Sequence, residues 1–229
     1  WSESVEEARR AGERLAHAAD SYATGAAYYR QAEVHRVLGD FTAAEDACQQ
    51  ASRWGRQPQP GLALLRLAQG RTDTAQAAIR RVVAETTDRL GRAKVLPAQV
   101  EIMLAVGDVQ GARDAAGELT GIAERYNTPA LHAVADHAQG AALLAEGDAR
   151  AAVVALRRAW QAWQELEAPY EAARVRVLVG SAAGPWGTRR PRPWSWTPPA
   201  AYSGSSAPRR TLPGWRRSTG GTPPPRGTG

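Results

Sequence analysis

The sequence predicts an all-α protein in which helical hairpins stack into an α-solenoid, followed by a disordered tail. Residues 1–183 are rich in Ala, Leu, Arg, Glu and Gln, which form helices readily, and no run alternates as a strand does. Four glycines also recur in this segment at spacings of 31, 37 and 40 residues, which indicates an internal repeat: Gly39, Gly70, Gly107 and Gly147.

The stretches around these glycines are similar to one another, in chain order LGDFTAAEDA (38–47), QGRTDTAQAA (69–78), VGDVQGARDA (106–115) and EGDARAAVVA (146–155). Glycine suits the positive φ at a helix C-terminus, and the Asp that follows it in three repeats can cap the next helix. In the second repeat we expect Thr72 or Asp73 to take the capping role. The stretches HRVL, LRLA, IMLA and ALLA close to each glycine are the ends of amphipathic helices, so each glycine is expected to join a hairpin.

Alanines mark the second helix of every predicted hairpin. One alanine lies five residues after each glycine, and another lies three residues further along the same helix face. Side chains this small let the paired helix approach closely, so we expect the first of each pair to be buried at the helix crossing: Ala44, Ala75, Ala112 and Ala152.

The C-terminal segment has a different composition. All 23 acidic residues lie in residues 1–183 with 21 basic ones, a net charge of −2, whereas residues 184–229 hold eight Arg, no acid and ten of the fifteen Pro. We therefore expect a repeat domain at 1–183 and a disordered basic tail at 184–229. The single Cys excludes a disulfide framework and a Cys-based zinc site, and no stretch is long enough to span a membrane, so a cytoplasmic location is expected.

The repeat resembles the tetratricopeptide repeat (TPR), and the run Leu38-Gly39-Asp40-Phe41 is similar to the turn signature of that family. The other three repeats lack the aromatic residue, and two of the three spacings are longer than usual. Two longer phrases, GAAYYRQAEVHRVLGDFTAAEDACQQASRWGRQPQPGLALLRLAQG (25–70) and LLAEGDARAAVVALRRAWQAWQELEAPYEAARVRVLVG (143–180), resemble the repeat region of large LuxR-type (MalT-like) transcriptional regulators of actinobacteria.

This resemblance implies a regulatory region that receives an effector or a partner and precedes a DNA-binding helix-turn-helix domain. Some such regulators also carry a nucleotide-binding ATPase domain. This sequence contains neither a helix-turn-helix pattern after residue 183 nor a G-x-x-x-x-G-K-[ST] motif, and its single lysine, Lys94, follows an alanine. DNA contact is therefore expected only through a domain that this chain lacks.

The resemblance stops near Ala183, and a shift of the reading frame would explain this. Because Trp is always encoded by TGG, PWGTRRPRPWSWTPPAA read in a shifted frame with GC-rich codons can give L-G-D-E-A-A-A-L-E-L-D-A-A-R. That reading is a fifth repeat whose glycine follows Gly147 by about forty residues, the spacing of the preceding repeat. We therefore expect a frameshift near residue 183, in the gene or in its sequencing. Because Trp1 is not an initiator Met, we also expect the chain to be a fragment or a processed product.

Four residues before the first repeat turn are the candidate partner groove: Tyr28, Tyr29, Glu33 and His35. They are expected on the first helix of a hairpin, which lines the concave side of a solenoid, with solenoid packing as the alternative. The concave surface would take a protein, a peptide or a small effector, and self-association is also considered.

No catalytic, cofactor or metal site is predicted, and an enzyme is not expected. His132 and His137 are five residues apart, which is not the spacing of two ligands on one helix face, and Cys48 is expected to be a small core residue. These two histidines, together with His17 and His35, are expected to be ordinary surface or groove histidines. Glu165 and Glu167 are expected on a solvated face.

Two further groups of residues have alternative readings. Trp160 and Trp163 are expected to pack between repeats, with a ligand-stacking surface as the alternative.

A stand-alone TPR interaction scaffold is the main alternative function. A nucleic-acid binder acting through the tail is the other, because the pairs Arg189-Arg190, Arg209-Arg210 and Arg216-Arg217 can neutralise phosphates and the neighbouring Trp can stack on bases.

Overall fold

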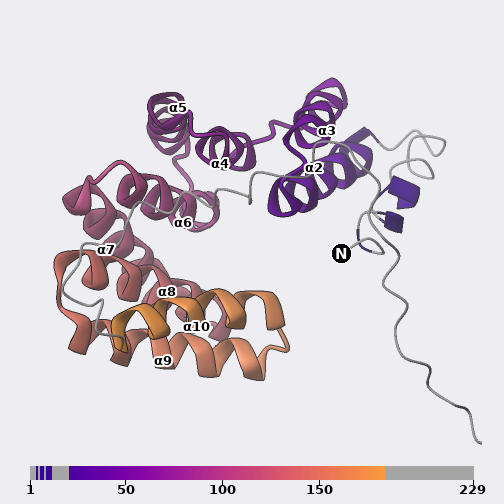
Figure 1. Ribbon diagram of the computed structural model, residues 1–229. Coiled ribbons are helices and arrows are strands. Elements are labelled where there is room, and N and C mark those ends of the chain that lie inside the picture. The colour runs from indigo at the N-terminus through magenta and orange to yellow at the C-terminus, as the bar shows by residue number, and fades with distance from the viewer. Residues whose placement is uncertain (1–3, 5, 8, 12–20, 184–229) are drawn as a thin grey trace, which may run out of the picture. The chain divides into compact units, whose positions relative to one another are not determined.

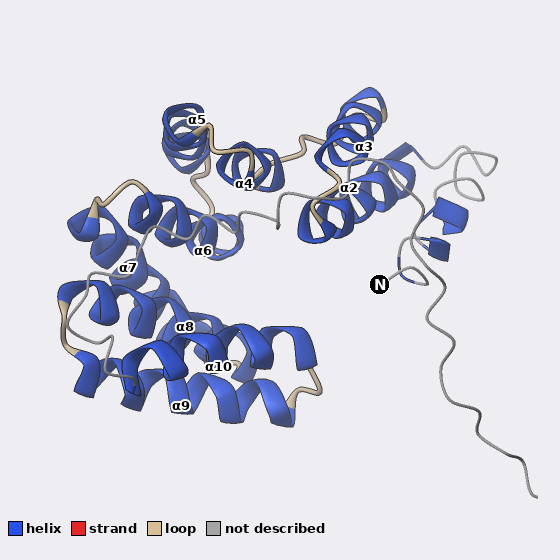
Figure 2. Ribbon diagram, viewed as in Figure 1, coloured by secondary structure: helices blue, strands red, loops and turns tan. Residues whose placement is uncertain are grey.

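The computed structural model of the 229-residue chain describes residues 4, 6–7, 9–11 and 21–183 (Figure 1). Within these residues the structure is helical and contains no strand, which confirms the all-α prediction (Figure 2). The helices from residue 21 onward are, in order, α2 (Ser21–Leu38), α3 (Phe41–Arg53), α4 (Gly61–Ala68), α5 (Thr72–Glu85), α6 (Arg89–Ala105), α7 (Val109–Tyr126), α8 (Pro129–Glu146), α9 (Ala149–Glu165) and α10 (Pro169–Ala183).

The helices form consecutive hairpins within one compact unit. The four repeat glycines join α2 to α3, α4 to α5, α6 to α7, and α8 to α9, so α10 stands where the first helix of a fifth hairpin would stand. First helices pack against the first helices of the neighbouring hairpins. The second helices α3, α5, α7 and α9 pack against first helices but make no contact with one another. We name the continuous row of described first helices the inner row, and the separated second helices the outer row.

The four repeat glycines end their helices with the same turn. Their φ angles lie between 77° and 90°, as the sequence predicts. In each turn the glycine N–H bonds to the carbonyl three residues back, and the next N–H bonds five residues back, as in Asp40 N to His35 O at 3.0 Å. This pair of bonds is the Schellman motif, which satisfies helix carbonyls that have no partner within the helix.

Aspartates cap three of the second helices, as predicted. Asp40, Asp108 and Asp148 each accept a hydrogen bond from the backbone N–H three residues later, at 2.9 to 3.1 Å. The prediction of a Thr72 or Asp73 cap is wrong. Because α5 starts two residues after its glycine like the other second helices, Thr72 is already the first helical residue, and the N-cap is Arg71, which makes no capping bond through its side chain.

Small residues fill the helix crossings. The alanine five residues after each repeat glycine is 0% exposed in all four hairpins. The helices α8 and α9 approach closely at Gly140, where an added Cβ atom would lie 2.5 Å from Leu156 Cγ and 2.7 Å from Leu156 Cδ2. Leu156 is itself fully buried. Glycine is therefore the residue that allows α9 to lie this close to α8.

The turn between α9 and α10 repeats the same hydrogen bonds without a glycine. Glu167 has φ 53°, and its N–H and that of Ala168 bond to Gln164 O and Trp163 O. A left-handed φ is strained for a residue with a Cβ. We expect Glu167→Gly to raise the free energy of unfolding by about 1 kcal/mol, measured by urea denaturation. Gly147→Ala, at φ 90°, is the matched control and should lower it by a similar amount; a Glu167→Gly variant no more stable than the wild type would contradict the strain argument.

Some predictions fall outside the described residues. The tail at 184–229, its Arg pairs, its boundary with the repeat domain and His17 all lie there. Among the prolines that are described, Pro129 and Pro169 begin α8 and α10, while Pro97 lies inside α6. A search of the described helices finds none that is long and apolar enough to cross a membrane.

Candidate functional site

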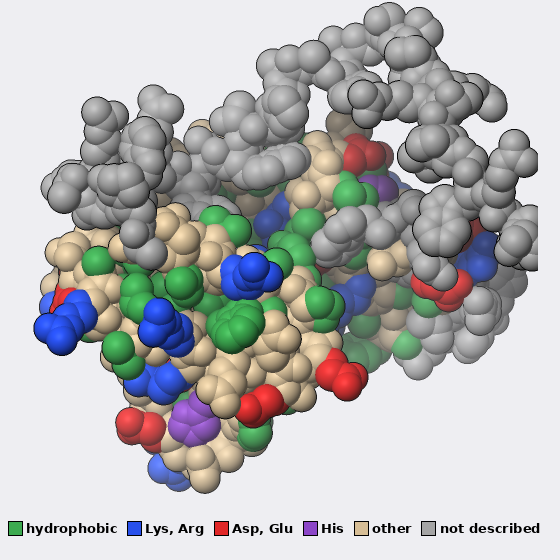
Figure 3. Space-filling view, turned by 60° about the horizontal axis from the view of Figure 1, so that its bottom comes forward, with side chains coloured by type: hydrophobic (Ala, Val, Ile, Leu, Met, Phe, Trp, Pro, Cys, Tyr) green, Lys and Arg blue, Asp and Glu red, His purple; other side chains and the backbone are tan. Residues whose placement is uncertain are grey.

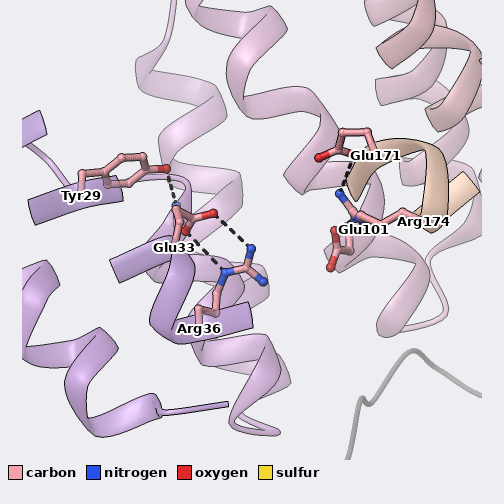
Figure 4. Close-up of polar contacts among 7 residues, drawn as sticks. Tyr29, Glu33, Arg36, Glu101, Glu171 and Arg174 are labelled. Atoms are coloured by element: carbon pink, nitrogen blue, oxygen red, sulfur yellow. Dashed lines mark hydrogen bonds and ion pairs between the residues drawn. The ribbon is translucent and has the colours of Figure 1, made fainter. Parts of the chain in front are cut away.

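The inner row of first helices carries a group of polar side chains, and Tyr29 on α2 lies at one end of it (Figure 4). Its hydroxyl accepts a hydrogen bond of 3.2 Å from the Gly61 N–H at the start of α4, and the Arg56 guanidinium lies 4.8 Å from its ring centre. Burial, with a smaller contribution from Glu33, raises the pKa of Tyr29 to about 12. Tyr29 therefore joins the first two hairpins as a neutral phenol.

Glu33 follows Tyr29 on the same face of α2 and pairs with Arg36, one turn further along, at 3.1 Å. Burial alone would lower the pKa of Arg36, but the carboxylates of Glu33 and Glu101 outweigh it, so the pKa is raised. The side chain of Arg36 is only 18% exposed. Arg36 is therefore a charged group held in a largely enclosed position by the acids around it.

Arg174 on α10 is the second enclosed cation of the inner row. Its guanidinium lies 2.8 Å from Glu101 of α6 and 3.3 Å from Glu171 of its own helix. Burial opposes its charge, and the two carboxylates again more than compensate, so the pKa of Arg174 is raised. Because Glu101 and Arg174 are 73 residues apart in sequence, this ion pair ties the third hairpin to α10.

The two clusters lie within electrostatic range of one another. The charge on Arg36 is influenced by Glu101 and by Tyr170 of α10, as well as by its neighbour Glu33. Figure 4 shows the α2 group on one side and the Glu101–Arg174–Glu171 group on the other. We name these six residues the inner polar surface: Glu33, Arg36, Glu101, Tyr170, Glu171 and Arg174. Its two guanidinium groups, three carboxylates and one phenol can exchange hydrogen bonds with polar groups of a ligand.

His137 of α8 lies near this surface. Burial, with nearby Arg174 as the second cause, lowers its pKa to about 4. The imidazole is therefore neutral at physiological pH, because burial disfavours its charged form and protonation would also place a second positive charge near the guanidinium. The sequence alone predicts only an ordinary surface or groove histidine at this position.

The four residues of the predicted partner groove divide between two faces of α2. Tyr29 and Glu33 lie together at the start of α4, as described above. Tyr28 and His35 share a different stripe with Ala32, which belongs to the core formed with Ala44 and Ala47 of α3. His35 Nδ1 is 3.8 Å from Asp40 at the repeat turn. The structure therefore does not bring all four side chains to one place.

Cys48 and the two tryptophans of α9 differ in how deeply they are buried. Cys48 is 4% exposed, as expected for a core residue, and burial raises the pKa of its thiol to about 11. Trp163 packs against the core of α9 and α10, as predicted, whereas Trp160 is 37% exposed and lies on the surface. The difference arises because only Trp163 is on the side of α9 that α10 covers.

Glu165 and Glu167 are exposed, as predicted, but they do not share a helix. The helix α9 ends at Glu165, and Glu167 lies in the following turn. His132 bonds to Asn127 at 2.9 Å. Within the described part of the chain, no three His, Cys, Asp or Glu side chains gather in a way that could hold a metal ion.

Sequence reasoning missed most of the inner polar surface. Arg36 could have been found, because it continues the stripe of Tyr29 and Glu33 at helical spacing. Glu101 and Arg174 carry no such signal, since they lie 73 residues apart on α6 and α10, two helices that both pack against α8.

Comparison of the chain with protein-family models, with curated proteins and with solved structures finds no match in any of the three.

Proposed function

We infer that residues 1–183 are a TPR-like α-solenoid that receives a protein, a peptide or a small effector on its concave side, as the regulatory region of a LuxR-type transcriptional regulator. The single observation that carries the binding part of this proposal is the inner polar surface. Charged residues of α2, α6 and α10 come within electrostatic range of one another there, although long stretches of sequence separate them.

The arrangement of the helices supports a solenoid with a concave inner row. First helices contact each other along the chain, whereas second helices contact only first helices. Helices that touch in one row and stand apart in the other give a curved stack, with the touching row on its inner side. The inner polar surface belongs to that row and would face a bound partner.

The charges of this surface suit a polar ligand better than an apolar one. Its two arginines and three acids are already paired, so a ligand would compete for hydrogen bonds rather than meet isolated charges. The Tyr170 ring, 39% exposed beside these groups, offers an apolar contact. We therefore propose a peptide segment or an effector that carries both polar and aromatic or aliphatic groups.

The proposal is tested by site-specific photo-cross-linking in cells of the source organism. A benzoylphenylalanine at position 170 should form a discrete cross-linked product, and Arg36→Ala together with Arg174→Ala should remove that product because both cations contact the partner. The same photoreactive residue at position 126 is the control, since Tyr126 on outer helix α7 is equally exposed, at 40%. Equal labelling at both positions, or labelling that survives loss of both arginines, would contradict the proposal.

A further inference from the structure

Helices α8 and α10 occupy equivalent places in the repeat and share a sequence register. Each is the helix that follows a complete hairpin, each begins with proline, and each carries a glycine eleven residues later: Pro129 and Gly140 in α8, Pro169 and Gly180 in α10. Residues forty positions apart therefore correspond, and the two helices can be compared residue by residue.

The second helix α9 covers one face of α8. Ala133 is fully buried on that face, and Gly140 is buried against Leu156 of α9. Asp136, between them, forms an ion pair of 2.6 Å with Arg158 of α9. These contacts define what a second helix supplies to a first helix: an apolar side chain over the glycine, and a charge opposite the residue four positions before that glycine.

The corresponding face of α10 has no such cover among the described residues. Ala173 and Gly180 are exposed where Ala133 and Gly140 are buried, and nothing lies within 4 Å of a Cβ atom added to Gly180. Val177, on the same stripe, is 55% exposed. Arg176, the counterpart of Asp136, has no ion pair within the described residues. Figure 3 shows hydrophobic and basic side chains side by side on the surface that α9 and α10 form.

A hollow of about 500 Å³ extends this open face at the start of α10. It is lined by the end of α9 and the first two turns of α10, including Trp163, Ala173 and Arg176. The indole N–H of Trp163 is buried and has no hydrogen-bond partner among the residues that the structure describes. In the α8–α9 hairpin the last turns of α9 run beside the first turns of α8, so the hollow lies where the last turns of a covering helix would lie.

We propose that the open face of α10, formed by Ala173, Arg176, Val177 and Gly180, binds an amphipathic helix of a partner protein. That helix runs antiparallel to α10 as α9 runs to α8, with an apolar side chain over Gly180 and its last turns in the hollow. In α10 the position equivalent to Asp136 is occupied by the basic residue Arg176. The partner helix therefore carries an acidic residue at the position where α9 carries Arg158.

Two peptides test the proposal against the full 229-residue chain. Both have the sequence of residues 148–165 with a side-chain bridge between positions 157 and 161 on the exposed face, because short isolated helices are marginal in water. One keeps Arg158, and the other carries Arg158→Glu. Binding is followed by fluorescence anisotropy. The Glu peptide should bind about 3- to 10-fold more tightly than the Arg peptide. The reason is that Glu at position 158 forms a partly exposed ion pair with Arg176 of the chain, whereas Arg at that position is repelled by it.

Variants of the chain locate the binding. Arg176→Glu should reverse the order of the two peptides. Gly180→Leu should weaken the Glu peptide at least about tenfold by filling the space over the glycine, a loss of about 1.4 kcal/mol. Gly117→Leu on α7 is the matched control, because Gly117 is also exposed and open, and it should leave binding unchanged.

Three results would overturn the proposal. The first is the absence of peptide binding, and the second is an equal affinity of the chain for the two peptides. The third is a dimer of the chain that dissociates on Gly180→Leu, which would show that a second copy occupies the face. The inference stands apart from the function proposed for the inner polar surface. Arg36→Ala and Arg174→Ala should abolish cross-linking at position 170 and leave binding of the Glu peptide unchanged.

Discussion

Gly140→Leu is expected to lower the free energy of unfolding by about 3 kcal/mol, the largest effect of any single substitution considered. Even the first carbon of a side chain at this position would lie 2.5 Å from Leu156 Cγ. Leu156 is 0% exposed and cannot move away without displacing its neighbours in the core of α9 and α10. The helices α8 and α9 would have to separate, which exposes the crossing. Urea denaturation followed by circular dichroism measures the change.

Gly180→Leu is the matched control for this prediction. It occupies the same register on α10, but no described residue lies within 4 Å of its added Cβ atom. Leucine forms helices better than glycine by several tenths of a kcal/mol, so this variant should be at least as stable as the wild type. Equal destabilisation by the two substitutions would mean that the face of α10 is covered as α8 is, and the equivalence drawn between the two helices would be wrong.

Acidification from pH 7.5 to pH 5 is expected to lower the free energy of unfolding by about 2 kcal/mol through His137 alone. Burial, followed by the charge of Arg174, lowers the pKa of this imidazole to about 4 in the folded chain, against an ordinary value of 6.5. The unfolded chain therefore binds more protons between these values. Stability is fully present above pH 6.5 and is lost as the pH falls toward 4.

His137→Asn should remove this part of the pH dependence, whereas His132→Asn should leave it in place. His132 is the suitable comparison because it lies on the same helix and bonds to Asn127 near the surface. The pKa of Glu45 and that of Glu118 are both lowered by hydrogen bonds from their arginine partners. These two ion pairs are therefore lost only at a pH more acidic than the range in which His137 acts. A wild-type chain whose stability is flat between pH 5 and 7.5 would show that His137 is not shielded from water.

The turns and crossings of the fold could be predicted because they depend on local chemistry. A positive φ requires glycine at Gly39 and its three equivalents, and an aspartate cap needs only the three residues that follow it. The buried alanines could be predicted for the same reason, since their spacing from the glycine fixes the helix face on which they lie. Glu167 shows the limit of this reasoning, because a turn of the same form occurs there without its usual residue.

The inner polar surface could not be predicted, because it depends on the packing of whole helices. Glu101 and Arg174 meet across α6 and α10, and no periodicity relates their positions in the sequence. Tyr29 and Glu33 belong to the predicted partner groove, but the start of α4 occupies the side of α2 on which they lie. Tyr29 therefore bonds to Gly61 instead of facing an open groove. His35 lies one turn before the end of α2, and its Nδ1 atom is 3.8 Å from Asp40 in the repeat turn.

The regulatory role proposed for this chain is tested most directly by sequencing the gene from before codon 180 to several hundred bases past codon 229 and translating it in all three frames. A shifted frame should continue through a fifth repeat and then into a helix-turn-helix. A coding region in which no shifted frame stays open, and no helix-turn-helix follows in any frame, would contradict it. The chain would then be an interaction scaffold without a role in transcription.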